Sequence, residues 1–162
     1  MFARLPLALA ICLAPLATWA LDRLPQGEGP TVLTIRAHGA EHALDATALR
    51  ALPADSFVTE TIWTEGEQAF TGVRMTELLN RLDIHSGQIT LVAANDYQIR
   101  IDVEDFTPDG ALLAYERNGA PMTLRDKGPV WLVYPYDADA RFRTEIIYAN
   151  SIWQLDRIVF DE

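Results

Sequence analysis

The segment "RDKGP" places charge directly beside unusual backbone chemistry. Arg125, Asp126 and Lys127 precede Gly128 and Pro129. Glycine permits backbone angles that other residues avoid, and proline removes one backbone donor, so this loop can approach a flat ligand closely. We predict that Arg125, Lys127 and Gly128 contact such a ligand. Asp126 either contacts it too or only orients Arg125. The alternative is an ordinary solvated loop.

Three other places combine an aromatic ring with a polar group. Trp63 precedes the polar segment "TEGEQ" and offers a ring to stack on. The turn that contains Asp96 and Tyr97 offers an acceptor for a ligand edge and an aromatic wall. At the start of the last expected strand, Ser151 could donate a hydrogen bond and Trp153 could stack. The alternatives are a core position for Trp63 and a plain turn around Asp96.

No pattern in the sequence indicates catalysis or metal binding. His38, His42 and His85 are scattered, and no carboxylate lies at ligand spacing from them. Neither a Ser-His-Asp order nor a phosphate-binding glycine motif is present. The only cysteine is Cys12. We therefore predict a binding site with no catalytic residue and no metal ligand.

The elements that must hold these residues are mostly strands. Alternating β-branched residues predict strands, and an Asn118-Gly119 turn predicts a hairpin. Asp45 is typical of a helix N-cap. The predicted fold is α+β, mostly β, with mixed sheets and a few short helices. Strands are expected at 31–37, 56–63, 89–94, 97–103, 130–133 and 151–160, a hairpin at 111–124, helices at 46–52 and 73–82, and turns or loops at 38–45, 64–70 and 137–150.

The beginning of the chain is typical of an export signal. Arg4 precedes an apolar stretch that runs from Leu5 to Leu16, and small residues follow it. We expect a signal peptide over 1–20, a flexible Pro/Gly-rich lead over 21–30, and one domain over 31–162. This organisation predicts a periplasmic protein. The net charge of −10 argues against nucleic acid and anionic lipid surfaces as partners.

Four segments in order resemble a known family. They are "FTGVRMTELL", "ANDYQIRIDVEDF", "LLAYERNGAPMTLRDKGPVWLVYP" and "SIWQLDRIVF". Together they resemble the sulfite-oxidase fold, the oxidoreductase molybdopterin-binding domain, over about Leu33 to Phe160. The enzymes of that family hold molybdenum through a cysteine thiolate that precedes the "GV…LL" helix. The corresponding stretch here, "TETIWTEGEQAFTGV", contains no cysteine, so resemblance in fold does not carry over the activity.

A cysteine-less subset of exported members is more similar still, in "RDKGP", "NDY" and "SIWQL". That resemblance implies binding of a free pterin rather than molybdopterin. It also implies signalling to the periplasmic region of a membrane protein that makes or degrades cyclic di-GMP. Two alternatives stay open: a molybdopterin-dependent oxidoreductase that lacks the usual cysteine, and an interaction module that binds no ligand.

Overall fold

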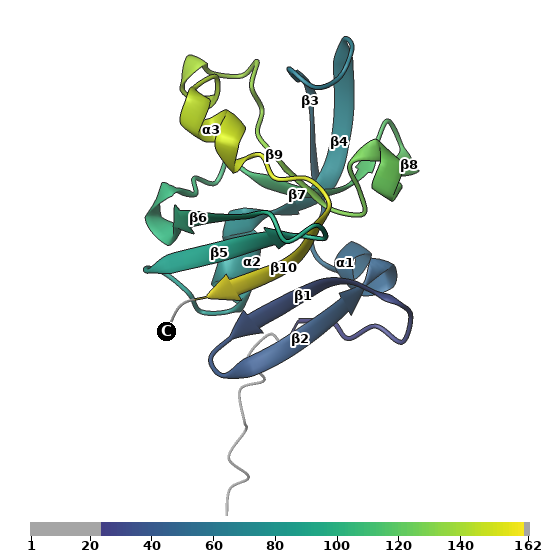
Figure 1. Ribbon diagram of the computed structural model, residues 1–162, viewed down its shortest axis with the longest axis vertical. Coiled ribbons are helices and arrows are strands. Elements are labelled where there is room, and N and C mark those ends of the chain that lie inside the picture. Colours follow the sequence, from purple (N-terminus) through teal and green to yellow (C-terminus); the bar gives the residue numbers. More distant parts are fainter. Residues whose placement is uncertain (1–23, 161–162) are drawn as a thin grey trace, which may run out of the picture.

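The computed structural model describes residues 24–160, which form two β-sheets with short helices at their ends (Figure 1). The first sheet has the strand order β2-β1-β10-β5-β6, and the second has the order β3-β4-β7-β8, with β9 paired to β7. The strands are β1 (Thr31–Ala37), β2 (Ala40–Asp45), β3 (Asp55–Glu60), β4 (Glu67–Arg74), β5 (Gln88–Ala93), β6 (Gln98–Asp102), β7 (Leu112–Arg117), β8 (Ala120–Pro121), β9 (Trp131–Val133) and β10 (Leu155–Phe160). The helices are α1 (Ala46–Ala51), α2 (Met75–Arg81) and α3 (Glu145–Asn150), and three 3-10 turns are η1 (Val103–Asp105), η2 (Leu124–Asp126) and η3 (Ala140–Phe142).

The first sheet is mixed, as predicted. β1 runs parallel to β10, and the other pairs in this sheet are antiparallel. Along β1, Leu33, Ile35 and Ala37 are buried and alternate with more exposed residues. This period of two places one face of the strand against the core. The mostly-β fold with mixed sheets and few short helices is therefore confirmed.

The second sheet contains the predicted hairpin. β7 and β8 pair across Asn118 and Gly119, which both have positive φ angles of 54° and 76°. A two-residue turn of this type matches the twist of the strands that it joins. Gly72 in β4 lies against β7, and a Cβ there would be 2.1 Å from the Leu113 carbonyl oxygen. The close approach of these two strands thus requires glycine.

Several local predictions were wrong. Residues 38–45, expected to form a turn, include the strand β2, and residues 64–70, expected to form a loop, include the start of β4. In both places pairing with a neighbouring strand stabilises an extended backbone that the local sequence does not favour. β3 ends at Glu60, so Trp63 lies in the following loop and not at the end of a strand.

A further error concerns residues 137–150, which were expected to form a loop. This segment contains η3 and the helix α3. Thr144 is the N-cap of α3, and its hydroxyl accepts a hydrogen bond from the Ile147 amide at 3.3 Å. Six residues are too few to show a helical hydrophobic period, so only the cap could have indicated this helix.

The N-terminal predictions fall partly outside the described residues. The expected signal peptide over 1–20 lies entirely within the undescribed segment. From Leu24 onward the lead contacts the domain: Leu24 is buried, and the Gly29 amide donates to the Asp45 carboxylate at 2.8 Å. Among residues 24–160, no helix has the length and apolar character needed to cross a membrane.

Two buried clusters form the core. The larger one joins the first sheet and the helices to residues of β4, β7 and β9, and the smaller one gathers Phe70, Leu112 and Trp131 with neighbours on the second sheet. Trp131 is fully buried, in agreement with its predicted core position. Trp63 is partly buried and packs against both clusters. It therefore lies where the two halves of the core meet.

Candidate functional site

A cavity of about 430 Å³ opens where the two clusters meet. Its walls come from the loop after β3, the end of β5 with the turn that follows it, the C-terminal end of α3, and the segment that leads into β10. Figure 1 shows α3 above the end of the first sheet, and the two dark-teal strands of the β3–β4 hairpin stand beside it. The lining residues are Trp63, Ala93, Asn95, Tyr97, Tyr148, Ala149, Ser151, Ile152 and Trp153.

Trp63 forms the centre of an aromatic wall. Its ring lies edge-on to four others, with centroid distances of 5.6 Å to Trp153, 5.8 Å to Trp131, 5.9 Å to Tyr148 and 6.1 Å to Tyr136. Such edge-to-face pairs are favourable beyond the area that they bury. The Trp63 amide also donates to the Thr61 hydroxyl at 3.1 Å, which anchors the loop. The ring of Trp63 is thus held in one orientation at the cavity.

Ser151 connects the end of α3 to the strand β9 behind the cavity. The Tyr136 hydroxyl donates to Ser151 Oγ at 2.6 Å, and Ser151 Oγ donates to the Ile147 carbonyl at 2.7 Å. The Trp131 indole donates to the Ser151 carbonyl at 3.3 Å. Burial raises the pKa of Tyr136, so this hydroxyl stays protonated as a donor. The single hydroxyl proton of Ser151 is already used, and it is not free for the predicted donation to a ligand.

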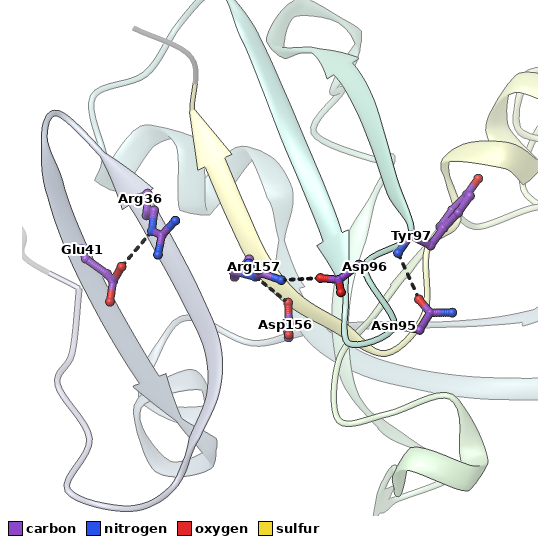
Figure 2. A network of polar contacts seen from close by, with 7 residues as sticks. All are labelled: Arg36, Glu41, Asn95, Asp96, Tyr97, Asp156 and Arg157. Atoms are coloured by element: carbon purple, nitrogen blue, oxygen red, sulfur yellow. Dashed lines mark hydrogen bonds and ion pairs between the residues drawn. The ribbon is translucent and has the colours of Figure 1, made fainter.

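The turn after β5 places two residues in the cavity wall and one outside it. Asn95 and Tyr97 line the cavity, and the Tyr97 amide donates to Asn95 Oδ1 at 3.2 Å. Figure 2 shows Asp96 pointing away from Tyr97, toward Arg157 on β10. The Asp96 carboxylate accepts from Arg157 at 3.1 Å. Asp96 is therefore an ion-pair partner beside the cavity and not the predicted acceptor inside it.

The charged loop lies next to the cavity but does not line it. Arg125 is exposed in η2. The Asp126 carboxylate accepts from the Thr123 hydroxyl at 2.7 Å and lies 3.9 Å from the Arg117 guanidinium. Its partners are therefore Thr123 and Arg117, and not Arg125, which it was predicted to orient. The Lys127 ammonium lies over the Trp153 ring, 4.3 Å from its centroid. Lys127 thus does not line the cavity itself but contacts Trp153, which does.

Gly128 is buried in the same loop for a reason of packing. A Cβ on this residue would be 2.2 Å from the Met122 carbonyl oxygen. No side chain fits in that space, whatever the loop binds.

Of the nine residues predicted to bind ligand, the structure gathers four around the cavity: Trp63, Tyr97, Ser151 and Trp153. It leaves out Asp96, Arg125, Asp126, Lys127 and Gly128. Lining residues absent from that prediction are Ala93, Asn95, Tyr148, Ala149 and Ile152. Asn95 belongs to the turn that was singled out, and Tyr148 follows the Thr144 cap, which was the available signal for α3.

The cavity wall suits a flat heterocycle with polar edges. Indole and phenol rings provide faces for stacking, and the Asn95 amide with nearby backbone groups can fix the ligand's orientation. Its volume falls within the range of small-molecule sites, which is about 300–1,000 Å³. No cysteine occurs among residues 24–160. In that range no group of three or more His, Cys, Asp or Glu side chains could hold a metal ion. The donor set therefore fits a pterin ring system but not molybdenum bound through a protein thiolate.

Comparison with known proteins agrees with this fold. Residues 28–141 match the family model described as "Oxidoreductase molybdopterin binding domain". The chain is also similar to a protein of Bacillus subtilis (strain 168) called "Uncharacterized oxidoreductase YuiH", with 27% identity over 78 residues. That alignment covers 47% of this chain and only 39% of the relative. The matched region contains most of both sheets, and the chain belongs to the oxidoreductase molybdopterin-binding domain family, with its sulfite-oxidase-like fold.

Proposed function

We propose that this protein binds a free pterin in the periplasm without catalysing a reaction, and that it acts as the ligand sensor of a membrane-bound signalling protein that controls cyclic di-GMP turnover. The observation that supports this proposal most directly is the cavity around Trp63. Trp63, the centre of the aromatic wall, lies in the segment where the resemblance places the cysteine ligand of the family's enzymes, so stacking is available there and thiolate ligation is not.

A bicyclic pterin has the properties that such a wall can recognise. It is flat, and one edge presents N–H donors beside a ring carbonyl. Stacking against Trp63 or Trp153, two good hydrogen bonds and the burial of the apolar ring surface would together give roughly micromolar affinity before the costs of ordering are subtracted. Tyr97 is 53% exposed at the cavity, so a bound ring would cover apolar surface that is now open to solvent.

The signalling part of the proposal comes from the family resemblance, and the surroundings of the cavity are compatible with it. The loop of Trp63 carries Ile62, which is 64% exposed, and α3 carries Ile146, which is 72% exposed. Trp63 and Tyr148 connect these two segments through their ring contact of 5.9 Å. A ligand between them would change the surface that a partner meets, which is the differential contact that a sensor requires.

A molybdopterin-dependent oxidoreductase is the second candidate. The family match and the name of the Bacillus relative support it. In that case a ligand other than a cysteine thiolate would have to complete the metal site. The residues of the cavity wall do not offer one with the usual chemistry.

The deciding experiment analyses what copurifies with protein expressed in a periplasm. Mass spectrometry and fluorescence identify an organic ligand, and elemental analysis measures molybdenum. A pterin near one equivalent with no molybdenum supports the sensor. Molybdenum with a dithiolene pterin supports the molybdopterin-dependent oxidoreductase instead. If neither is found and added reduced pterins do not raise the melting temperature, the interaction module without ligand is the better description.

Variants then test whether the cavity matters. Trp63→Ala removes the centre of the aromatic wall, so we expect pterin binding to weaken by at least about tenfold, the loss of one stacking partner. Arg125→Gln, outside the cavity, should change binding little. Glu41→Gln is the matched control, because it removes an exposed ion pair with Arg36 on the β1–β2 hairpin (Figure 2). If Trp63→Ala binds like the wild type, another site holds the ligand.

A further inference from the structure

We infer that the cavity selects its ligand by charge: it accepts an uncharged flat heterocycle and disfavours the same heterocycle with a phosphate monoester. This inference rests on the proposed pterin-binding function and specifies the class of pterin. It also means that the cavity does not suit the cofactor of the family's enzymes, because molybdopterin carries a phosphate on its side chain.

The first observation is the composition of the cavity wall. Among the residues that the structure describes, none of those lining the cavity is lysine, arginine or histidine. A phosphate monoester has a charge of about −1.5 to −2 at neutral pH. Burying part of that charge without a cation or several donors is unfavourable. The wall therefore offers no group that compensates a phosphate.

The second observation concerns Arg157, which lies beside the turn that lines the cavity. It contacts two carboxylates, those of Asp96 at 3.1 Å and Asp156 at 3.2 Å, as Figure 2 shows. One guanidinium between two carboxylates leaves a net negative charge. Asp96 is the neighbour in sequence of both Asn95 and Tyr97, so this charge lies outside the cavity, beside the turn that lines it. It would repel an anionic tail that leaves the cavity there.

The third observation concerns Lys127, whose ammonium contacts the wall residue Trp153. Its ammonium lies over the rings of Trp153 and Trp131, at 4.3 Å and 5.7 Å from their centroids. These cation–π contacts stabilise the ammonium in place. A phosphate would have to draw Lys127 away from both rings and would thereby loosen Trp153, which the heterocycle needs as a wall.

The fourth observation is the direction of α3. Tyr148 and Ala149 line the cavity at the C-terminal end of this helix, where its last carbonyl groups lie. Helix C-termini carry partial negative charge and accept hydrogen bonds. Three of the last four carbonyls of α3 already accept hydrogen bonds, those of Ile147 and Tyr148 from Ser151 and that of Asn150 from the Ile152 amide, so this short helix end disfavours an anion only weakly. The composition of the wall, the charge around Arg157 and the net charge of −10 act in the same direction.

The test uses neopterin and neopterin 3′-monophosphate, which differ only by the phosphate. Quenching of tryptophan fluorescence gives both dissociation constants at about 0.01 M and about 1 M salt, where the Debye lengths are about 30 Å and about 3 Å. We compare the two compounds by a ratio, the dissociation constant of the phosphate divided by that of neopterin. We expect this ratio to be about ten or more at low salt and to be smaller at high salt. A purely steric exclusion would leave the ratio independent of salt.

Two variants with the same change in net charge sharpen the test. Asp96→Asn removes the carboxylate that pairs with Arg157 beside the cavity-lining turn, and asparagine tolerates the φ of 63° at this position. We expect Asp96→Asn to reduce the ratio at low salt by about threefold or more, and Glu41→Gln, on the edge strand β2 of the same sheet (Figure 2), to leave it unchanged. Equal effects of the two variants would contradict a local cause.

The outcomes separate this inference from the proposed function. If neopterin binds and its phosphate binds equally or more tightly, the inference is wrong and the pterin site stands. Tight binding of the phosphate that is lost in Lys127→Gln would assign Lys127 as a phosphate ligand and would also overturn the inference. If neither compound binds, the proposed function fails, and the inference fails with it.

Discussion

Gly128, in the loop beside the cavity, is required by packing and not by ligand binding. A Cβ at this position would be 2.2 Å from the Met122 carbonyl and 2.6 Å from Met122 Cβ. We expect Gly128→Ala to lower the free energy of unfolding by about 1–3 kcal/mol, the usual cost of overpacking. Urea denaturation measures this loss. Gly66→Asn is the control, because a side chain there meets nothing within 4 Å and asparagine tolerates its φ of 62°. Equal stabilities of the two variants would contradict the steric account.

Ser151 tests the hydrogen bonds behind the cavity. Ser151→Ala leaves the hydroxyl of Tyr136, a residue that is 2% exposed, without its acceptor at 2.6 Å. An unsatisfied buried hydroxyl costs about 1–3 kcal/mol, so the midpoint of urea denaturation should fall. Tyr136→Phe in the Ser151→Ala background removes the orphaned group and should recover part of the loss. If the double variant is the less stable of the two, the hydroxyl is satisfied in another way.

At the scale of elements, Asp45 joins the lead, β2 and α1. Its carboxylate accepts from the Ala48 amide at 2.7 Å and from the Gly29 amide at 2.8 Å. The Ala48 amide, with the Gly29 amide second, lowers the pKa of Asp45 below its ordinary value of 3.8. A lowered folded-state pKa means that the unfolded chain binds the proton more tightly. The stabilisation by Asp45 is therefore complete above pH 3.8 and is lost as the pH falls below that value.

This linkage predicts the behaviour of Asp45→Asn. We expect the variant to melt at a lower temperature than the wild type at pH 7, and the difference to shrink as the pH falls from about 5 to about 3. Thermal melts monitored by circular dichroism measure it. Glu41→Gln provides the comparison for a surface carboxylate. A difference that stays constant over this range would show that Asp45 acts through its shape as an N-cap and not through its charge.

The elements also show which features the sequence could predict. Strong local signals were read correctly: the Asp45 cap of α1, the Asn118-Gly119 hairpin and the alternating strand β1. Elements that depend on distant partners were missed. The strand β2 is extended because it pairs with β1, and α3 is a six-residue helix held between its cap and the aromatic wall. Propensity carries little information about either kind of contact.

The residues of the candidate site also divide into those with a local signal in the sequence and those that depend on a distant partner. Aromatic residues such as Trp63 and Trp153 could be named as ligand candidates from their neighbours in sequence, and both line the cavity. Charged residues were less predictable, because a charge can be satisfied by a partner far along the chain. Asp96 pairs with Arg157, sixty-one positions away. That contact takes its carboxylate out of the cavity, and no local pattern indicates it.

For the whole molecule, the position of the cavity has a consequence for stability. The cavity lies where the two core clusters meet, and Trp63 packs against both of them. A ligand held there contacts segments that belong to both halves of the protein. Binding to the folded state alone stabilises it by about 2.7 kcal/mol when the free ligand is at one hundred times its dissociation constant. Because the cavity joins the two halves of the core, we expect a single cooperative unfolding transition, and we expect its whole midpoint to shift when ligand binds.

Hydrogen exchange with neopterin tests this expectation residue by residue. Protection should increase in the three segments that line the cavity, which are 61–66, 93–97 and 148–153, and the melting temperature should rise by several degrees. The β1–β2 hairpin should change only as much as global stability requires, since none of its residues line the cavity. In Trp63→Ala both effects should disappear at the same neopterin concentration. Protection confined to a single segment, with an unchanged melting temperature, would indicate a ligand bound at one wall and would contradict a site that joins the two halves of the core.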